Sequence, residues 1–246
     1  QNVSVQIISD PLRAVEHLKA GELVAFGTET VYGLGADARN SAAVANIYTT
    51  KGRPSFNPLI VHVADLAAAE SLIVIPYRAL AETFWPGPLT LVGHLRDPMI
   101  SPIVTAGLDT LAVRIPDHPR TLDLLRVFGG PVAAPSANPS GQISPTTAAH
   151  VAESFAGGIS AVLDTGPTTI GLESTILDVT RGPVLLRHGG IPKETLESFL
   201  GHPIEEATTG EAIRTPGQLQ SHYAPNARVQ LNQTLPSPRA VLIGFG

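Results

Sequence analysis

The chain of 246 residues contains no cysteine, one methionine, one tryptophan and only three lysines. The lack of cysteine excludes disulfides and thiolate metal sites, and it fits a reducing compartment. No run of about 18 apolar residues is present to span a bilayer. The start, residues 1–4, lacks the basic and then apolar layout of a signal peptide. We therefore expect a cytoplasmic protein that does not contact a membrane.

Charge is also scarce, because only 15% of the residues are charged and the net charge is -5. A broad nucleic-acid surface needs a basic patch that releases counterions, so the composition argues against one. Any tRNA contact is expected to be local and weak, or to be made by a partner protein. The 43% of hydrophobic residues is enough for a folded core, which excludes a disordered chain.

Short apolar runs alternate with helical patterns through most of the chain, which predicts an α/β fold. We expect helices over residues 11–20, 41–51, 76–84, 119–128, 147–154 and 193–200, and strands over residues 23–26, 59–63, 89–94, 111–115, 131–134, 161–163, 174–178 and 184–187. Asp10 before Pro11 predicts a capped helix start, and Ser144 before Pro145 predicts a second one.

The composition changes after Gly201, where Pro, Gly, Thr, Glu and Gln follow without a sustained period. This pattern predicts three parts: a main domain over residues 1–201, a linker over 202–227, and a segment over 228–246 in which an apolar run resumes.

Lys51 and Arg53 are the most informative cations, since a chain with three lysines has no lysine-rich face to explain Lys51. Together with Asn57 they follow an expected helix, and the pair suits a polyphosphate and a departing pyrophosphate. The alternative is that both cations only complement the helix C-terminus. His62, in the next strand, is by itself better explained as a core histidine or a residue at a surface edge than as a ligand contact.

Arg114 interrupts the apolar run of residues 111–115, and a buried charge there needs an anion. A protein carboxylate and a substrate carboxylate explain it equally well. Ser136, Asn138 and Ser144 lie in a loop rich in small donors that suits phosphate or ribose, or forms plain turns. The glycine-rich stretch 27–35 follows a strand and leads toward a helix, and it is either an ordinary turn or a substrate loop.

Several common sites are absent from the sequence. The glycine stretch is not a phosphate-binding P-loop or a dinucleotide fingerprint. There is no Gly-x-Ser-x-Gly elbow and no His-Glu-x-x-His, so a serine hydrolase or a protein-bound transition metal is not expected.

Six motifs in order together resemble the YrdC-like family: GTETVYGLG at 27–35, KGRPSFNPLIVHV at 51–63, WPGPLTLV at 85–92, TAGLDTLAVRIP at 105–116, APSANPSGQISPT at 134–146 and GLESTILDV at 171–179. The His-Tyr-Ala-Pro segment at 222–225 is similar to the linker of the longer members, the L-threonylcarbamoyladenylate synthases. The resemblance to these two-domain members implies that the linker folds over the active site and that residues 228–246 hold the first strand of a second small α/β domain. The resemblance implies an open, twisted mixed sheet with a concave basic cavity. It also implies synthesis of L-threonylcarbamoyl-AMP from L-threonine, bicarbonate and ATP, with release of pyrophosphate, for modification of the tRNA adenosine next to the anticodon by a downstream transferase complex.

The resemblance also implies roles for individual residues. A threonine site would comprise Thr30, His62, Arg114, Ala134 and Ser174. An ATP site would comprise Lys51, Arg53, Asn57, Thr110, Ser136, Asn138, Ser144, Arg187 and Tyr223, with Lys51 and Arg53 stabilising the departing pyrophosphate. Magnesium is expected with ATP, without an identified protein ligand.

The chain also departs from that pattern, because the middle of the linker, Gln218 to Ser221, lacks two basic residues found in some relatives. Two other functions fit the same fold: a non-enzymatic RNA-binding module, and a carbamoyl-transfer domain of the kind found in hydrogenase-maturation proteins.

Overall fold

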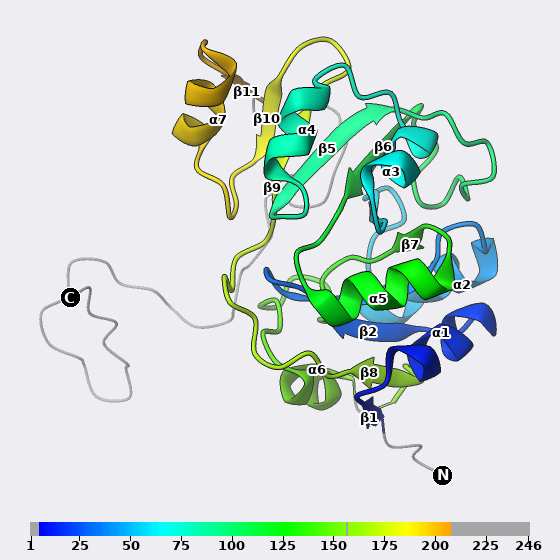
Figure 1. The fold of residues 1–246 in the computed structure, drawn as a ribbon. Coiled ribbons are helices and arrows are strands. Elements are labelled where there is room, and N and C mark those ends of the chain that lie inside the picture. The colour runs from blue at the N-terminus through cyan, green and yellow to red at the C-terminus, as the bar shows by residue number, and fades with distance from the viewer. Residues whose placement is uncertain (1–4, 156, 208–246) are drawn as a thin grey trace, which may run out of the picture.

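The computed structural model describes residues 5–155 and 157–207. In this part of the chain, strands of both directions form one 11-stranded mixed sheet in the order β1-β8-β2-β3-β7-β4-β6-β5-β9-β10-β11. The strands are β1 (Gln6–Ile8), β2 (Val24–Gly27), β3 (Tyr32–Asp37), β4 (Ile60–His62), β5 (Leu89–His94), β6 (Thr110–Arg114), β7 (Val132–Ala133), β8 (Ala161–Leu163), β9 (Thr175–Asp178), β10 (Val184–Arg187) and β11 (Glu205–Glu206). The expected α/β class with an open, twisted mixed sheet is confirmed (Figure 1).

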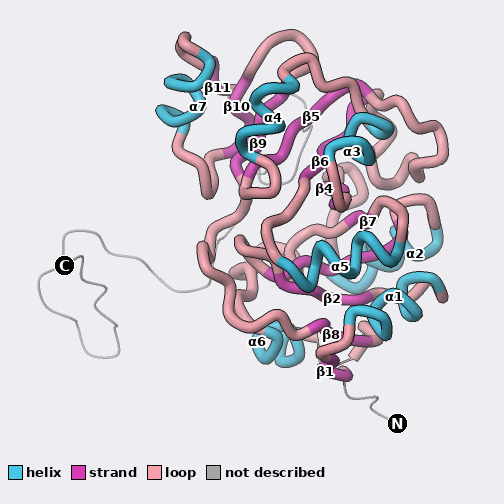
Figure 2. Tube along the Cα trace, viewed as in Figure 1, coloured by secondary structure: helices cyan, strands magenta, loops and turns pink. Residues whose placement is uncertain are grey.

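Helices cover the sheet, and long loops join its two ends (Figure 2). The helices are α1 (Pro11–Lys19), α2 (Ser41–Lys51), α3 (Leu66–Leu72), α4 (Arg78–Phe84), α5 (Pro119–Phe128), α6 (Ala148–Ser154) and α7 (Lys193–Leu200). Every helix and strand predicted from the sequence is present with small shifts at its ends. The prediction missed β1, β3, β11 and α3.

Strand β2 shows how the core is built, because it is buried on both faces. Val24 and Phe26 pack in a cluster with Val15 of α1 and Leu124 of α5. Ala25 points the other way, into the larger cluster that holds α2. Successive strand residues point to opposite faces, so a continuous apolar run is what a strand between two helix layers requires.

The glycine stretch proved to be a hairpin, not a loop leading into a helix. β3 pairs antiparallel with β2, with Gly35 opposite Val24. A Cβ on Gly35 would lie 2.6 Å from Cε1 of Phe26, so no side chain fits there. Glycines in strand interiors mark such close approaches, and they hide the strand from a reading based on β-branched residues.

The helix starts gave one confirmed prediction and one wrong one. Oδ1 of Asp10 accepts a hydrogen bond from the Leu12 backbone N–H at 2.9 Å, as expected for a cap. Ser144 caps nothing. Thr147 is the cap of α6, accepting from the backbone N–H of His150, and the Ser144 hydroxyl turns instead toward Glu173.

Most of the chain that follows the predicted main domain lies outside the described residues. α7 packs against α4 through an edge contact of Phe84 and Phe199, and β11 pairs parallel with β10. Residues 208–246, which hold most of the predicted linker and the strand after it, are not described. None of the described helices is long and apolar enough to cross a membrane.

Candidate active site

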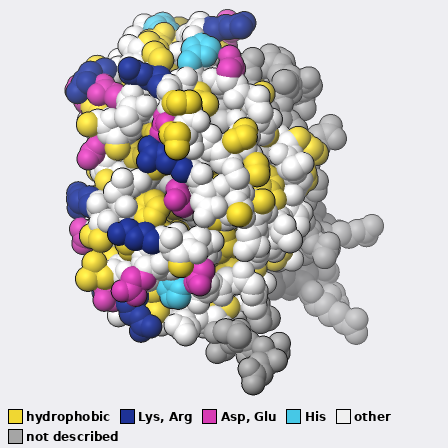
Figure 3. Space-filling model, turned by 90° about the vertical axis from the view of Figure 1, so that its right-hand side faces the viewer, with side chains coloured by type: hydrophobic (Ala, Val, Ile, Leu, Met, Phe, Trp, Pro, Cys, Tyr) yellow, Lys and Arg dark blue, Asp and Glu magenta, His cyan; other side chains and the backbone are white. Residues whose placement is uncertain are grey.

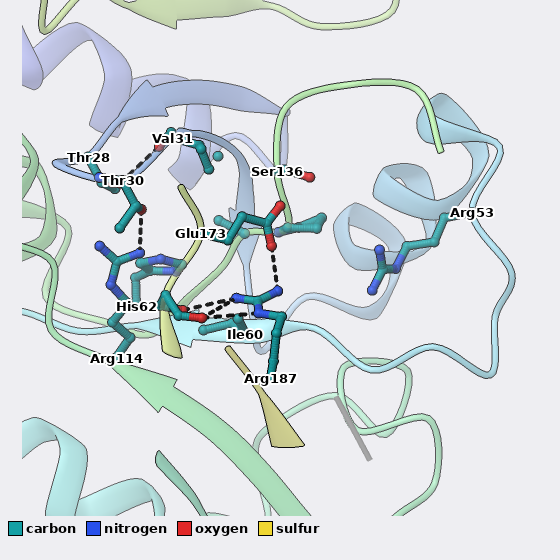
Figure 4. A pocket seen from close by; sticks show the side chains of 14 residues that line it. Thr28, Thr30, Val31, Arg53, Ile60, His62, Arg114, Ser136, Glu173 and Arg187 are labelled. Atoms are coloured by element: carbon teal, nitrogen blue, oxygen red, sulfur yellow. Dashed lines mark hydrogen bonds and ion pairs between the residues drawn. The ribbon is translucent and has the colours of Figure 1, made fainter. Parts of the chain in front are cut away.

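A hollow that opens to solvent lies where the ends of β4, β6 and β10 meet three loops. Figure 4 shows its side chains. The residues that line it are Thr28, Thr30, Val31, Gly33, Arg53, Ile60, His62, Arg114, Ala134, Pro135, Ser136, Glu173, Ser174 and Arg187. All five residues predicted for threonine are among them, as are Arg53, Ser136 and Arg187 from the ATP set.

Arg114 has its anion within the protein. Its Nη2 pairs with Oε1 of Glu29, its Nη1 donates to Thr30 Oγ1 at 2.9 Å, and its Nε donates to the Gly87 carbonyl at 3.2 Å. The sequence left open whether a protein carboxylate or a substrate carboxylate balances the charge of Arg114. The structure supplies a protein carboxylate, that of Glu29. These contacts use three of the five guanidinium donors, so a substrate carboxylate could still be bound by the other two.

The turn that carries Glu29 and Thr30 is held from several sides. The second oxygen of Glu29 accepts from the backbone N–H of Asp117 at 2.9 Å. The backbone carbonyls of Glu29 and Thr30 accept from Ile170 and Gly171 at 2.8 and 3.0 Å. The loop between β8 and β9 thus clamps this turn, which gives Arg114 a fixed partner.

His62 is a neutral imidazole inside the pocket. Burial, and then the adjacent charge of Arg114, lower its pKa to about 3, and the two residues are neighbours in the β4–β6 register. Its Nδ1 is buried and has no hydrogen-bond partner among the described residues. Buried polar atoms are normally satisfied, so this nitrogen suits a bound molecule or water.

Lys51 is buried, and it holds the Ser136–Asn138 loop. Its Nζ donates to the backbone carbonyls of Ser136 and Asn138. Burial, and then the charge of Arg53, lower the pKa of Lys51 to about 7. A neutral amine still has two N–H groups for these two contacts, and Lys51 is not among the residues that line the hollow. Its predicted catalytic role stays a prediction.

Arg53 differs from Lys51 because it lines the hollow. It donates to the backbone carbonyls of Asn57 and Pro58 at 3.2 and 2.9 Å, and it lies 6.0 Å from the ring centre of Tyr48. Burial lowers the pKa of Arg53 to about 10, so it stays charged at neutral pH. Within residues 5–155 and 157–207 no carboxylate pairs with it. Its charge is therefore available to a ligand phosphate.

The other residues predicted to bind ATP differ in where the structure places them. Asn57 and Asn138 are buried near the hollow's wall, and the Oδ1 of each lacks a hydrogen-bond partner in the described structure. Ser144 reaches the hollow only through Glu173. Thr110 begins β6, four residues before Arg114, and does not line the hollow. Tyr223 lies outside the described residues.

Two carboxylates were missed by the sequence reasoning, Glu29 and Glu173. Both lie within motifs that were recognised, yet neither was assigned a role. Glu173 pairs with Arg187, just as Glu29 pairs with Arg114. The signal was available, since two arginines in apolar strands each require an anion.

The comparisons with known proteins identify the family. A model of the Sua5/YciO/YrdC family, described as telomere recombination, matches residues 16–189. The chain belongs to this family. A second model, described as threonylcarbamoyl-AMP synthase, C-terminal domain, matches residues 191–241. This match begins before α7, whereas the sequence predicted a boundary at 201, which stays a prediction.

Individual relatives support the same family assignment. The chain is 50% identical over 232 residues to a threonylcarbamoyl-AMP synthase of Bacillus subtilis, covering 91% of the chain and 67% of the relative. The crystal structure of P. abyssi Sua5 complexed with L-threonine matches with a TM-score of 0.84 and 45% identity, over 91% of this chain and 68% of that one. The chain thus spans about two thirds of the length of these relatives. E. coli YciO, 19% identical with a TM-score of 0.66 over 75% of this chain and 94% of that one, shares the fold.

Proposed function

We propose that this chain synthesises L-threonylcarbamoyl-AMP from L-threonine, bicarbonate and ATP, releasing pyrophosphate. The observation that carries the proposal is the meeting of all five predicted threonine residues with Arg53, Ser136 and Arg187 around one hollow. Family membership supports it, because relatives at 42–50% identity are named threonylcarbamoyl-AMP synthase. L-threonine as a substrate is further supported by the ligand named for P. abyssi Sua5.

The two sides of the hollow suit two different substrates. On one side Thr30, His62 and Arg114 offer hydroxyl, imidazole and guanidinium groups in a buried space, which suits a small amino acid. On the other side Arg53 and Ser136 are half-buried, which suits the larger and more polar ATP. Figure 4 shows Glu173 and Arg187 between them.

The proposed reaction has two steps and needs no covalent enzyme intermediate. The neutral threonine amine joins bicarbonate to give a carbamate, with loss of water. A carbamate oxygen then attacks the α-phosphorus of ATP, and pyrophosphate leaves. We propose that the protein acts by holding the reactants together and by stabilising the growing phosphate charge with Arg53.

Magnesium is proposed to enter with ATP. The part of the chain that the structure describes has no cluster of three or more His, Asp or Glu residues that could hold a metal ion. The carboxylates Glu29 and Glu173 are each paired with an arginine. Mg²⁺ is commonly held by substrate phosphates and water with few protein ligands, which this side-chain set would allow. The ion would neutralise phosphate charge alongside Arg53.

The downstream partners are proposed on chemical grounds. The product is a mixed anhydride of a carbamate and a phosphate, and it would be passed to a transferase complex that acts on tRNA. On the face of the molecule in Figure 3, Lys and Arg side chains are interspersed with Asp and Glu. The described residues on that face therefore offer no continuous basic stripe for RNA. The cytoplasmic location stays a prediction.

The test is pyrophosphate release from ATP with and without L-threonine and bicarbonate, with the product identified by mass. Release that requires both substrates and yields threonylcarbamoyl-AMP supports the proposal. ATP binding without turnover would instead favour a purely binding protein. Carbamoyl transfer from carbamoyl phosphate, without any need for threonine, would favour the carbamoyl-transfer reading.

A further inference from the structure

Thr28 lines the hollow, although the sequence reasoning gave it no role. Its side chain is buried, and it precedes Glu29 and Thr30, both of which are bonded to Arg114. Figure 4 shows Thr30 above the guanidinium of Arg114, with Thr28 and Val31 beyond it. Thr28 therefore lies close to the arginine predicted to bind the substrate carboxylate, and any effect on that arginine must pass through its neighbours.

The hydrogen-bonding capacity of the Thr28 hydroxyl is fully used. Its one proton is donated to the Val31 carbonyl at 2.8 Å. Its oxygen lies 2.8 Å from Thr30 Oγ1 and accepts from the Thr30 backbone N–H at 3.2 Å. Because Thr28 has no second proton, the contact between the two hydroxyls must be donated by Thr30. A hydroxyl has one donor and two acceptor positions, so Thr28 keeps none for a ligand.

The direction of the Thr30 hydroxyl follows from this assignment. Its proton is committed to Thr28, so toward Arg114 it can only accept, and Nη1 of Arg114 donates to it at 2.9 Å. A continuous chain of hydrogen bonds therefore runs from Arg114 through the two hydroxyls to the Val31 carbonyl. Without the Thr28 hydroxyl, the Thr30 proton would lose its acceptor in this chain, and nothing there would fix the lone pair that meets Arg114.

The other two nitrogens of Arg114 are held by different partners. Nη2 pairs with Glu29, and Nε donates to the Gly87 carbonyl at 3.2 Å. Three contacts in three directions fix the plane of the guanidinium, and with it the directions of the two N–H groups that remain. Recognition of a carboxylate by arginine depends on that plane, because the donors and acceptors must face one another. The contact with Thr30 is thus one of three that orient the carboxylate site.

We propose that Thr28 is a positioning residue for the carboxylate of the amino-acid substrate, and that it acts through Thr30 on the Nη1 end of Arg114. This inference rests on the proposed function, in which Arg114 binds the carboxylate of L-threonine. The competing role is general support of the turn at residues 28–30. That role would change the affinity for every ligand of the hollow, whereas positioning changes the affinity for carboxylate ligands alone.

Two substitutions and three ligands distinguish these roles. Thr28→Val keeps the shape and removes the hydroxyl, whereas Thr28→Ser keeps the hydroxyl. L-threonine and ATP are titrated separately by calorimetry, and threoninol, in which CH₂OH replaces the carboxylate, is measured as a competitor of L-threonine. Thr28→Val should weaken L-threonine binding about tenfold, the scale of one hydrogen bond to a charged group. Thr28→Ser should stay within about threefold of the wild type.

The ligands without a carboxylate provide the selective readout. The affinities for threoninol and for ATP should change by less than about threefold in both variants, because neither ligand would use the carboxylate site. The ratio of L-threonine affinity to ATP affinity is a second readout that does not depend on threoninol. Equal weakening of all the ligands in Thr28→Val would show general support of the turn and overturn the inference.

Thr121→Val is the matched control. Thr121 is also buried, and its hydroxyl donates to the Gly27 carbonyl, at the start of the same turn. It takes no part in the chain that ends at Arg114. Both valine variants remove a buried hydrogen bond, so both should lower Tm, but only Thr28→Val should weaken L-threonine binding. An equal loss of L-threonine affinity in Thr121→Val would overturn the inference.

The outcomes also separate this inference from the proposed function. Unchanged L-threonine affinity in Thr28→Val, in a protein that makes threonylcarbamoyl-AMP, overturns the inference alone. The predicted affinity pattern in a protein that makes no such product leaves the inference standing and overturns the proposed function. A wild-type protein that binds no L-threonine overturns both.

Discussion

The two halves of the hollow are built in different ways. On the half predicted for threonine, Thr30 is 0% exposed and His62 and Arg114 are 4% exposed, and the arginine is bonded on three of its nitrogens. On the half predicted for ATP, Arg53 and Ser136 are half-buried, and the partners of Arg53 among the described residues are backbone carbonyls and the Tyr48 ring. The first half is a pre-organised interior site, and the second keeps charge and acceptors available.

The difference follows from the cost of burial. A charge deep in the protein must be paired in the fold itself, so Arg114 comes with Glu29. Arg53 lies nearer the opening and is half-buried, and the Asn57 and Pro58 carbonyls accept from it in place of a carboxylate. The comparison predicts that changes in the buried half damage the fold, whereas changes in the open half damage mainly binding and turnover.

The largest effect should come from Arg114→Ala. It leaves the buried carboxylate of Glu29 without its counter-ion, and breaking such a pair costs about 3–5 kcal/mol of folding free energy. Chemical denaturation should show this loss. Arg126→Ala, which removes an exposed arginine paired with Asp123, should be close to the wild type. Similar stability of the two variants would contradict the claim that the ion pair of Arg114 and Glu29 stabilises the fold.

The second effect is acid destabilisation through His62. Its pKa is about 3 in the fold against an ordinary value of 6.5, so between these values the unfolded chain binds more protons and stability falls as the pH falls. The loss should reach ~2 kcal/mol by pH 5. Denaturation curves for the wild type and His62→Gln, measured from pH 7 to pH 4, check this. A parallel decline in both proteins would show that His62 is not the group responsible.

The third effect belongs to the open half. Arg53→Ala should lower turnover at least about tenfold by removing a charge that stabilises departing pyrophosphate, with little change in Tm. Arg53→Lys should recover part of the rate, since it restores the charge but not the planar fork. Near-normal turnover in Arg53→Ala would remove this residue from the mechanism.

The smallest effect should come from Lys51→Met. Methionine keeps much of the apolar length and removes the donor to the Ser136 and Asn138 carbonyls. Loosening this loop should raise the KM for ATP about threefold, the scale of one modest hydrogen bond, with kcat little changed. A fall in kcat as large as that of Arg53→Ala would instead show that Lys51 acts directly on the phosphates.

Local signals decided much of the fold from the sequence alone. Apolar runs such as residues 23–26 predicted strands because a strand between two helix layers is buried on both faces. The cap at Asp10 was readable because it depends on neighbouring residues. β3 was not readable, since its glycines are explained by residues from other parts of the chain: Phe26 and Val132 approach Gly35, and Ala134 approaches Gly33.

The site likewise combines features that could be read from the sequence with contacts between residues far apart in the chain. The sequence by itself determined that Arg114 needs an anion, that Lys51 and Arg53 form an unusual cationic pair, and, through ordered motifs, which loops matter. Only the tertiary structure decided that Glu29 is the anion, that Lys51 bonds carbonyls, and that Glu173 joins Ser144 to Arg187. The physical reason is that burial and pairing depend on contacts between residues far apart in the chain, whereas capping and periodicity are local.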